Sequence, residues 1–264
     1  MTAHAQPSLF IPHGGGPCFF MPDPTNVWGG MAAFLRSIPN RLPDAVKAIL
    51  IVSGHWETDG FSFTGVAEPS LIYDYQGFPP ETYRLRYDAP GDPAMAAKAA
   101  ALLTAAGLPA SVDPKRGLDH GVFVPLKVAF PDANIPVVEM SVDRGLDPKL
   151  HIAAGRALAP LRDRGVLIIG SGMSFHNMRG YNDPRYTAPS EQFDTWLSSS
   201  LVLEGRERAE RLAAWETAPA ARLSHPDAEH LLPLMVAAGA ADGPGEKIFG
   251  EHVLKTAISG FLFK

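Results

Sequence analysis

The sequence holds a single cysteine, Cys18, among its 264 residues. One cysteine cannot form an intrachain disulfide. No run approaches the roughly 20 apolar residues that a membrane-spanning helix needs. The first residues, Met1 to Pro7, lack the charged and apolar regions of a secretory signal peptide. These absences lead us to expect a cytoplasmic protein without a membrane partner.

Basic residues neither dominate nor cluster. The chain has 23 Lys and Arg against 28 Asp and Glu, a net charge of −5 at pH 7 with neutral histidines. A nucleic acid or an anionic membrane surface is therefore not an expected partner. Hydrophobic residues make up 46% of the chain, which is enough for a sizeable core.

Buried-strand patterns alternate with helical patterns along the whole chain, and no linker or repeat interrupts them. This alternation predicts the α/β class: one domain over residues 1–264, with a central, mostly parallel or mixed sheet and helices on both faces. Strands are predicted over residues 8–11, 48–53, 61–66, 135–141, 166–170 and 257–263. Helices are predicted over residues 31–38, 93–106, 122–130, 148–161, 190–213 and 228–238.

Histidines follow three of the predicted strands. His55 comes just after the strand over residues 48–53, and His13 follows the first strand and precedes three glycines. His176 follows the Gly-Ser-Gly end of the strand over residues 166–170. Ligands of open α/β sheets bind beyond the carboxyl ends of the strands. The sequence therefore predicts one metal or catalytic cluster at the carboxyl edge of one sheet.

Two further histidines, His120 and His230, stand at predicted element ends. Imidazole is both a common metal ligand and the side chain best suited to proton transfer near neutral pH. A lone histidine is usually structural, and we expect this of His151, which lies within a helical pattern. The segment from Gly170 to Ser174 departs from the G-x-S-x-G pattern of serine hydrolases, so that class gains little support.

Five segments together resemble the class III extradiol ring-cleavage dioxygenases, and most of all the branch that includes the 4,5-DOPA extradiol dioxygenases. The resemblance runs from about Ser8 to the C-terminus, with the motifs in order. They are Pro12-His13-Gly14-Gly15-Gly16-Pro17, Ser53-Gly54-His55-Trp56-Glu57, Gly117-Leu118-Asp119-His120-Gly121, Gly170-Ser171-Gly172 with His176-Asn177, and His225-Pro226 with Glu229-His230-Leu231-Leu232-Pro233-Leu234.

The resemblance implies a non-haem Fe(II) site that binds a catechol and O2. His13 and His55 match the first two metal ligands, and His230 matches the third in the DOPA branch. The wider superfamily has a carboxylate there, which makes Glu229 the rival. Both are predicted on the first turn of one helix, where adjacent residues point about 100° apart. We therefore choose His230.

The resemblance also implies roles around the metal. His176 matches a catalytic acid–base histidine, and His120 matches a catalytic histidine that contacts substrate. The product would be a muconic semialdehyde. The aromatic loop over residues 73–83 could wall a pocket for a flat ligand through Tyr75 and Phe78, or could simply pack its own aromatic rings.

Two other functions use the same residues. Three histidines also suit a catalytic zinc with an open position, which would make the protein a zinc-dependent hydrolase. The fold could also be reused by a binding protein without catalysis. Zinc can replace iron in a purified sample, because it binds imidazole sites more tightly. The usual habit of soluble enzymes favours a homodimer.

Overall fold

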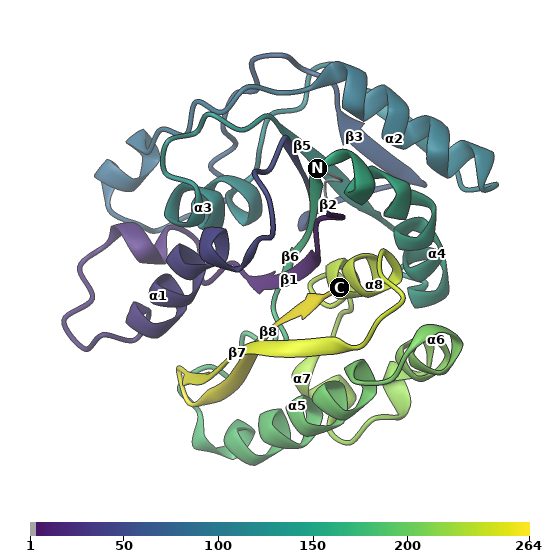
Figure 1. The fold of residues 1–264 in the computed structure, drawn as a ribbon. Helices are drawn as coiled ribbons and strands as arrows, with labels where there is room; N and C mark the ends of the chain where they lie inside the picture. The colour runs from purple at the N-terminus through teal and green to yellow at the C-terminus, as the bar shows by residue number, and fades with distance from the viewer. Residues whose placement is uncertain (1–3) are drawn as a thin grey trace.

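The strands of this computed structural model, which describes residues 4–264, join into one eight-stranded sheet. Its strand order is β4-β3-β5-β2-β6-β1-β8-β7 (Figure 1). The strands are β1 (Ser8–Pro12), β2 (Ala48–Thr58), β3 (Phe61–Thr64), β4 (Ala110–Asp113), β5 (Val137–Asp143), β6 (Val166–Gly172), β7 (Gly245–Val253) and β8 (Thr256–Phe263). The α-helices are α1 (Gly29–Ser37), α2 (Pro93–Ala105), α3 (His120–Ala129), α4 (Pro148–Leu158), α5 (Thr187–Leu201), α6 (Gly205–Ala213), α7 (Ala221–Ser224) and α8 (Leu232–Gly239).

The four central strands are parallel, and the strands that flank them on either side run antiparallel to them. β2 pairs in parallel with both β5 and β6, and β6 pairs in parallel with β1. β3 runs antiparallel to β5, and β8 runs antiparallel to β1. The predicted mixed sheet is confirmed. As a consequence, the carboxyl ends of four neighbouring strands meet at one edge.

Helices cover both faces of this sheet, as the sequence predicted. In β2, Leu50 and Val52 belong to the core cluster that includes α2, α4 and α8. The alternate residues Ile49 and Ile51 belong to the cluster that includes α1 and α3. Figure 1 shows α1 and α3 on one side of the central strands and α4 and α8 on the other. Burial on both faces explains why these strands read as continuous apolar runs.

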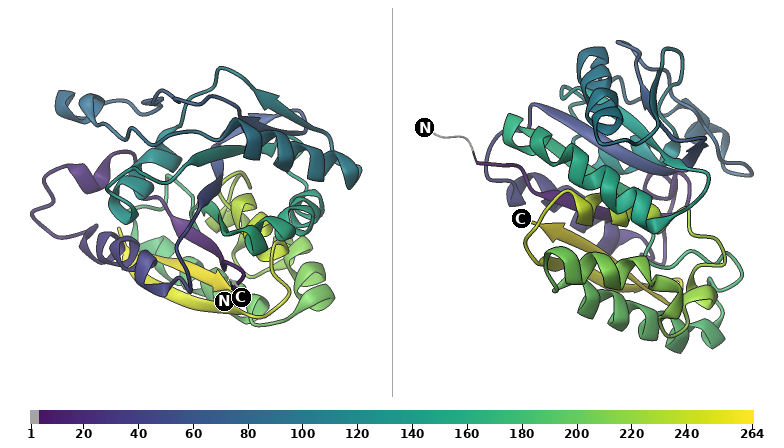
Figure 2. Two further views of the ribbon diagram at one scale, coloured as in Figure 1. Left: turned by 45° about the horizontal axis from the view of Figure 1, so that its top comes forward. Right: turned by 90° about the vertical axis from the view of Figure 1, so that its right-hand side faces the viewer.

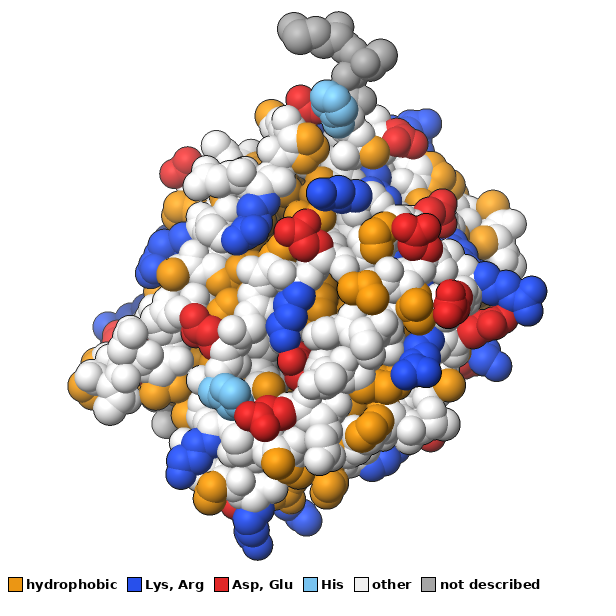
Figure 3. Space-filling model, turned by 60° about the horizontal axis from the view of Figure 1, so that its bottom comes forward, with side chains coloured by type: hydrophobic (Ala, Val, Ile, Leu, Met, Phe, Trp, Pro, Cys, Tyr) orange, Lys and Arg blue, Asp and Glu red, His pale blue; other side chains and the backbone are white. Residues whose placement is uncertain are grey.

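The β7–β8 hairpin lies at the opposite end of the molecule from α2 and β3 (Figure 2). Its outer strand β7 is held to α5 by an ion pair between Lys247 and Asp194 at 2.6 Å and by a hydrogen bond between His252 and Glu191 at 2.9 Å. Figure 3 shows acidic and basic side chains interspersed over the face of the molecule that is drawn there. Charged side chains on an edge strand discourage pairing with another sheet. None of the helices in residues 4–264 combines the length and apolar composition of a membrane span.

Two predicted helices differ most from those in the structure. The single helix over residues 190–213 is wrong: α5 ends at Leu201 and α6 begins at Gly205, where the backbone has a positive φ of 50°. The helix predicted over residues 228–238 begins only at Leu232, because Pro233 occupies the first turn, where proline is favoured. Glu229 and His230 therefore lie in a turn, not on a helix.

The strand β2 also differs from its prediction. It continues through His55 to Thr58 instead of ending at Ser53. Val52 pairs with Met140 of β5, whereas Glu57 pairs with Val142, so β2 carries extra residues in a bulge between the two pairs. Bulges re-aim side chains next to functional sites. No pattern in the sequence indicated β4 or β7, which are short or partly exposed edge strands.

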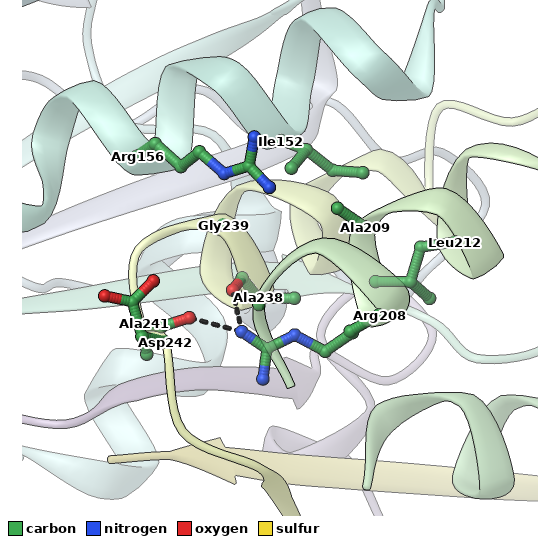
Figure 4. Close-up of a pocket in the computed structure, with 10 residues that line it drawn as sticks. Ile152, Arg156, Arg208, Ala209, Leu212, Ala238, Gly239, Ala241 and Asp242 are labelled. Carbon is green, nitrogen blue, oxygen red and sulfur yellow. Dashed lines mark hydrogen bonds between the residues drawn. The ribbon is translucent and has the colours of Figure 1, made fainter. Parts of the chain in front are cut away.

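A buried arginine caps the C-terminal end of α8, the helix that follows His230. The Arg208 guanidinium donates to the carbonyls of Ala238, at 2.8 Å, and of Ala241 (Figure 4). It also donates to the carbonyl of Gly243. The last carbonyls of a helix lack partners within it and attract cations. Arg208 thus fixes the far end of α8.

Replacing Arg208 with methionine should lower the free energy of unfolding by about 3 kcal/mol, because it leaves three carbonyls without their charged donor. Urea denaturation measures the change. Arg206→Met is the matched control: this side chain is 90% exposed and pairs with Glu210, so its loss should change stability little. Equal effects of the two substitutions would contradict the capping role.

Candidate metal centre

The structure brings five histidines together at the carboxyl edge of the central strands. His13 follows β1, His55 lies in the bulge of β2, His120 begins α3, and His176 follows β6. His230 comes from the turn before α8. The ring centroids of His13, His55 and His230 are 4.6 to 5.2 Å apart. His120 lies 4.0 Å from His55, and His176 stacks on His230 at 3.5 Å.

Three of these rings present nitrogens to one point. His13, His55 and His230 each offer a ligand atom, and these atoms lie within 4.8 Å of one another. The Nδ1–H of His13 donates to the Gly14 carbonyl at 2.8 Å, which leaves Nε2 deprotonated. That Nε2 is buried and has no hydrogen-bond partner. A buried nitrogen lone pair facing two other imidazoles fits a divalent ion such as iron or zinc.

Glu229 lies on the opposite side of the His230 ring from His55. The His230 Nδ1–H donates to Glu229 Oε1 at 2.8 Å, while His230 Nε2 lies 3.2 Å from His55 Nε2. Glu229 and His230 both lie in a turn and not on a helix, so the 100° separation expected for adjacent helical residues was the wrong reason for choosing His230. The geometry instead gives Glu229 the position of a carboxylate that orients a histidine, a common arrangement around metals.

Burial keeps the central imidazoles neutral at pH 7. It lowers the pKa of His13 and of His230 well below the usual value, and neighbouring histidines lower the His13 value further. Burial likewise lowers the pKa of His55 to about 4. Neutral imidazole is the form that binds metal.

A buried polar network holds His55 in place. The backbone N–H of His55 donates to the Ser53 hydroxyl at 3.2 Å, and that hydroxyl donates to Asp119 at 2.8 Å. Arg116 in turn donates to Asp119 at 3.0 Å and to Glu139 at 3.2 Å. Burial beside Asp119 raises the pKa of Glu139. The network also fixes the start of α3, and with it His120.

Close backbone contact positions His230. A Cβ at Gly172, the last residue of β6, would lie 2.1 Å from the His230 carbonyl oxygen. That carbonyl accepts from the Met173 N–H at 3.0 Å. The Gly-Ser-Gly end of β6 therefore lets the turn before α8 rest directly on the strand.

His120 and His176 each face a carboxylate. The backbone and Nδ1–H groups of His120 both donate to Asp74 Oδ1, at 2.9 and 2.8 Å. Burial alone would raise the pKa of Asp74, but these hydrogen bonds lower it to about 2. His176 Nδ1 lies 3.4 Å from Glu229 Oε1. Burial opposes ionisation of Glu229 as well, yet hydrogen bonds from His176 and His230 lower its pKa.

A cavity of about 410 Å³ opens above the histidines. Tyr75 and Phe78 both line it, as the sequence suggested, and the Tyr75 ring meets His120 edge to face at 5.7 Å. Trp28 and Met173 also line it, although no sequence signal singled them out. Asp74 was missed as well, since it stands in the aromatic loop without a recognisable motif.

Two other buried histidines are structural. His151 accepts from the Asp143 N–H at 3.1 Å and donates to the Asp147 carbonyl at 2.7 Å, which confirms it as a core residue. His225 is bonded to the Ser174 carbonyl at 3.0 Å. Neither lines the cavity.

An α/β sheet that carries buried imidazoles at its carboxyl edge, below an aromatic cavity, is the architecture of a metal-dependent enzyme. Residues 8–261 match the sequence profile of the LigB family, described as the catalytic LigB subunit of aromatic ring-opening dioxygenase. The chain belongs to this family, and its enzyme class is extradiol ring cleavage. The resemblance drawn from the five motifs is thus confirmed.

Relatives cover most of the chain. The dioxygenase tasH of Hapsidospora irregularis is 40% identical over 257 residues, 89% of this chain and 78% of that protein. The 4,5-DOPA dioxygenase extradiol of Beta vulgaris is 45% identical over 199 residues, 74% of this chain and 73% of that protein. The crystal structure of an uncharacterized protein from Escherichia coli K12 has a TM-score of 0.78 at 28% identity, and the match covers 98% of this chain and 100% of that one.

The stability of the metal-free protein should fall as the pH is lowered from about 6.5 to 4. Burial lowers the pKa of folded His151 from 6.5 to about 4, so in this range only the unfolded chain binds the proton. Between pH 7.5 and 5, His151→Gln should reduce the loss by about 2 kcal/mol in urea denaturation. The control is His4→Gln, at a side chain 77% exposed. An unchanged pH dependence in His151→Gln would contradict this account.

Proposed function

We propose that this chain is a non-haem Fe(II)-dependent extradiol dioxygenase that opens the ring of a catechol with O2 to give a muconic semialdehyde, with residues 1–264 as one catalytic domain. One observation carries the proposal. The buried, unpartnered Nε2 of His13 faces His55 and His230 beneath an aromatic cavity, in a chain of a ring-opening family.

In this proposal His13, His55 and His230 hold the metal. Bound Fe(II) would supply open positions for the two catechol oxygens and O2, and would favour ionisation of a bound hydroxyl. Each of the three residues makes a further hydrogen bond. His13 is bonded to the Gly14 carbonyl, His230 to Glu229, and the backbone N–H of His55 to Ser53. The rings of His13 and His230 and the backbone of His55 are thereby held in place before any ligand binds.

His120 and His176 would handle protons. Because the Nδ1–H of His120 is held by Asp74, its Nε2 is free to accept a hydrogen bond from a catechol hydroxyl. His176 lies at the cavity wall, with its Nδ1 3.4 Å from Glu229 Oε1. His176 could therefore take a proton from the substrate and return it during ring opening.

Tyr75 and Phe78 would contact the flat face of the ring. The Tyr75 hydroxyl donates to the Thr82 carbonyl at 2.7 Å, which fixes the ring as an apolar wall. Phe78 packs against the loop after His13, where a Cβ at Gly16 would lie 2.9 Å from its ring. The two aromatic rings meet edge to face at 5.5 Å.

The same imidazoles would accept zinc, and a zinc-dependent hydrolase is the second candidate. Membership of a ring-opening dioxygenase family favours the first. A cytoplasmic location and a homodimer stay predictions from the sequence.

Anaerobic loading with Fe(II), followed by addition of a catechol and O2, should give oxygen uptake and a yellow product. The zinc-loaded protein should give neither. A protein that takes up no oxygen with any catechol, or that hydrolyses esters when loaded with zinc, would overturn the proposed reaction.

Replacing His13 with alanine should abolish binding of one equivalent of Fe(II), measured by elemental analysis after anaerobic loading. His13 is the most informative residue to replace, because it belongs to only one of the possible metal-binding groups. The two others, His55-Asp74-His120 and His176-Glu229-His230, do not include it. His252→Ala, at an exposed histidine, is the control and should bind metal fully. Full occupancy in the His13 variant would place the ion elsewhere.

Replacing His176 with glutamine should leave metal binding intact and lower kcat at least 100-fold, because the proton carrier is lost while the imidazole set is kept. Metal content and oxygen uptake are measured on the same sample. Near-normal turnover would remove His176 from the proton-transfer steps.

A further inference from the structure

Away from the histidines, the side chains that line the cavity are apolar, except for the Gln76 amide and the hydroxyl groups of two tyrosines. Its lining includes Trp28, Phe78, Met173 and Leu254. The lining tyrosine Tyr181 donates its hydroxyl to the Phe175 carbonyl at 2.9 Å, and the Tyr75 hydroxyl is likewise taken by backbone. A substituent on the ring of a bound catechol would therefore meet ring faces and aliphatic groups.

No lysine or arginine is among the lining residues that the structure describes. The charged side chains that approach the site are carboxylates, Asp74 bonded to His120 and Glu229 bonded to His230. A carboxylate on the substrate would lose water here without gaining a cation, and it would add to the negative charge. Burial of an unpaired charge is strongly unfavourable.

The mouth of the cavity extends this apolar surface. Met178 lines the cavity and is 72% exposed, and the other exposed large hydrophobic side chains, Val202 and Leu223, do not line it. Leu254, at the tip of the β7–β8 hairpin, lines the same cavity. Exposed apolar groups at a cavity commonly mark a ligand-binding surface.

We propose that the substrates are catechols with an uncharged, apolar ring substituent, and that catechols bearing a carboxylate are disfavoured. This inference rests on the proposed ring-opening function. The substituent would lie between the Trp28 and Leu254 side of the cavity and the Met178 lip, while the hydroxyl groups face the histidines. The apolar wall favours binding of an apolar substituent, and the lack of a cation among the described lining residues disfavours a carboxylate.

The direct test compares 3-(3,4-dihydroxyphenyl)propionate with its methyl ester, which share the catechol and the chain and differ in charge. With Fe(II)-loaded protein at pH 7, kcat/KM from oxygen uptake should be at least tenfold higher for the ester. An acid that reacts as well as the ester would overturn the proposal. Arg179 follows Met178 in the chain and is exposed. If Arg179→Ala then slowed only the acid, this arginine would be the cation supplied to the carboxylate.

Anaerobic titration calorimetry separates this inference from the reaction itself. If no catechol is turned over, the proposed function fails, but binding of the two compounds still decides the substrate class. At least tenfold tighter binding of the ester supports the inference. Equal or tighter binding of the acid, or binding of neither compound, overturns it.

A charge placed at the lip gives a second test. Met178→Lys should raise the kcat/KM ratio of acid to ester at least fivefold, because it adds the cation that the wall lacks. Val202→Lys, at a side chain 59% exposed and outside the cavity, is the matched control and should leave the ratio unchanged. An unchanged ratio in Met178→Lys, or an equal rise in both variants, would contradict the placement of the substituent.

Discussion

The site depends on burying several neutral imidazoles side by side with their outer nitrogens already bonded. The Gly14 carbonyl, Glu229 and Asp74 accept from His13, His230 and His120. Each of these bonds fixes which nitrogen keeps its lone pair. Burial lowers the pKa of His13, His55 and His230, so these three imidazoles stay neutral and ready for a cation at neutral pH.

The fold supplies this arrangement through close backbone contacts more than through side-chain packing. The parallel strands carry His13 and His55 to one edge, and glycine at the end of β6 lets the turn that holds His230 approach the strand. At the far end of α8, Arg208 binds the last carbonyls of the helix. The helix that begins just after a proposed metal ligand is thus fixed at both ends.

Patterns that depend on local periodicity could be predicted from the sequence: the α/β class, the mixed sheet and the five histidines at its edge. Features set by tertiary contacts could not. The bulge that carries His55 arises from pairing with β5, and the start of α8 depends on Pro233. Asp74 gave no signal, because its role comes from reaching His120 across the fold.

The central claim is that one divalent ion lies among His13, His55 and His230. Anomalous diffraction at the iron edge, from crystals grown and loaded without oxygen, tests it most directly. The account predicts one strong peak within bonding distance of all three Nε2 atoms, with the Glu229 carboxylate bonded to His230 Nδ1 and not to the ion. A peak coordinated by His176 and Glu229, or by Asp74 and His120, would contradict it.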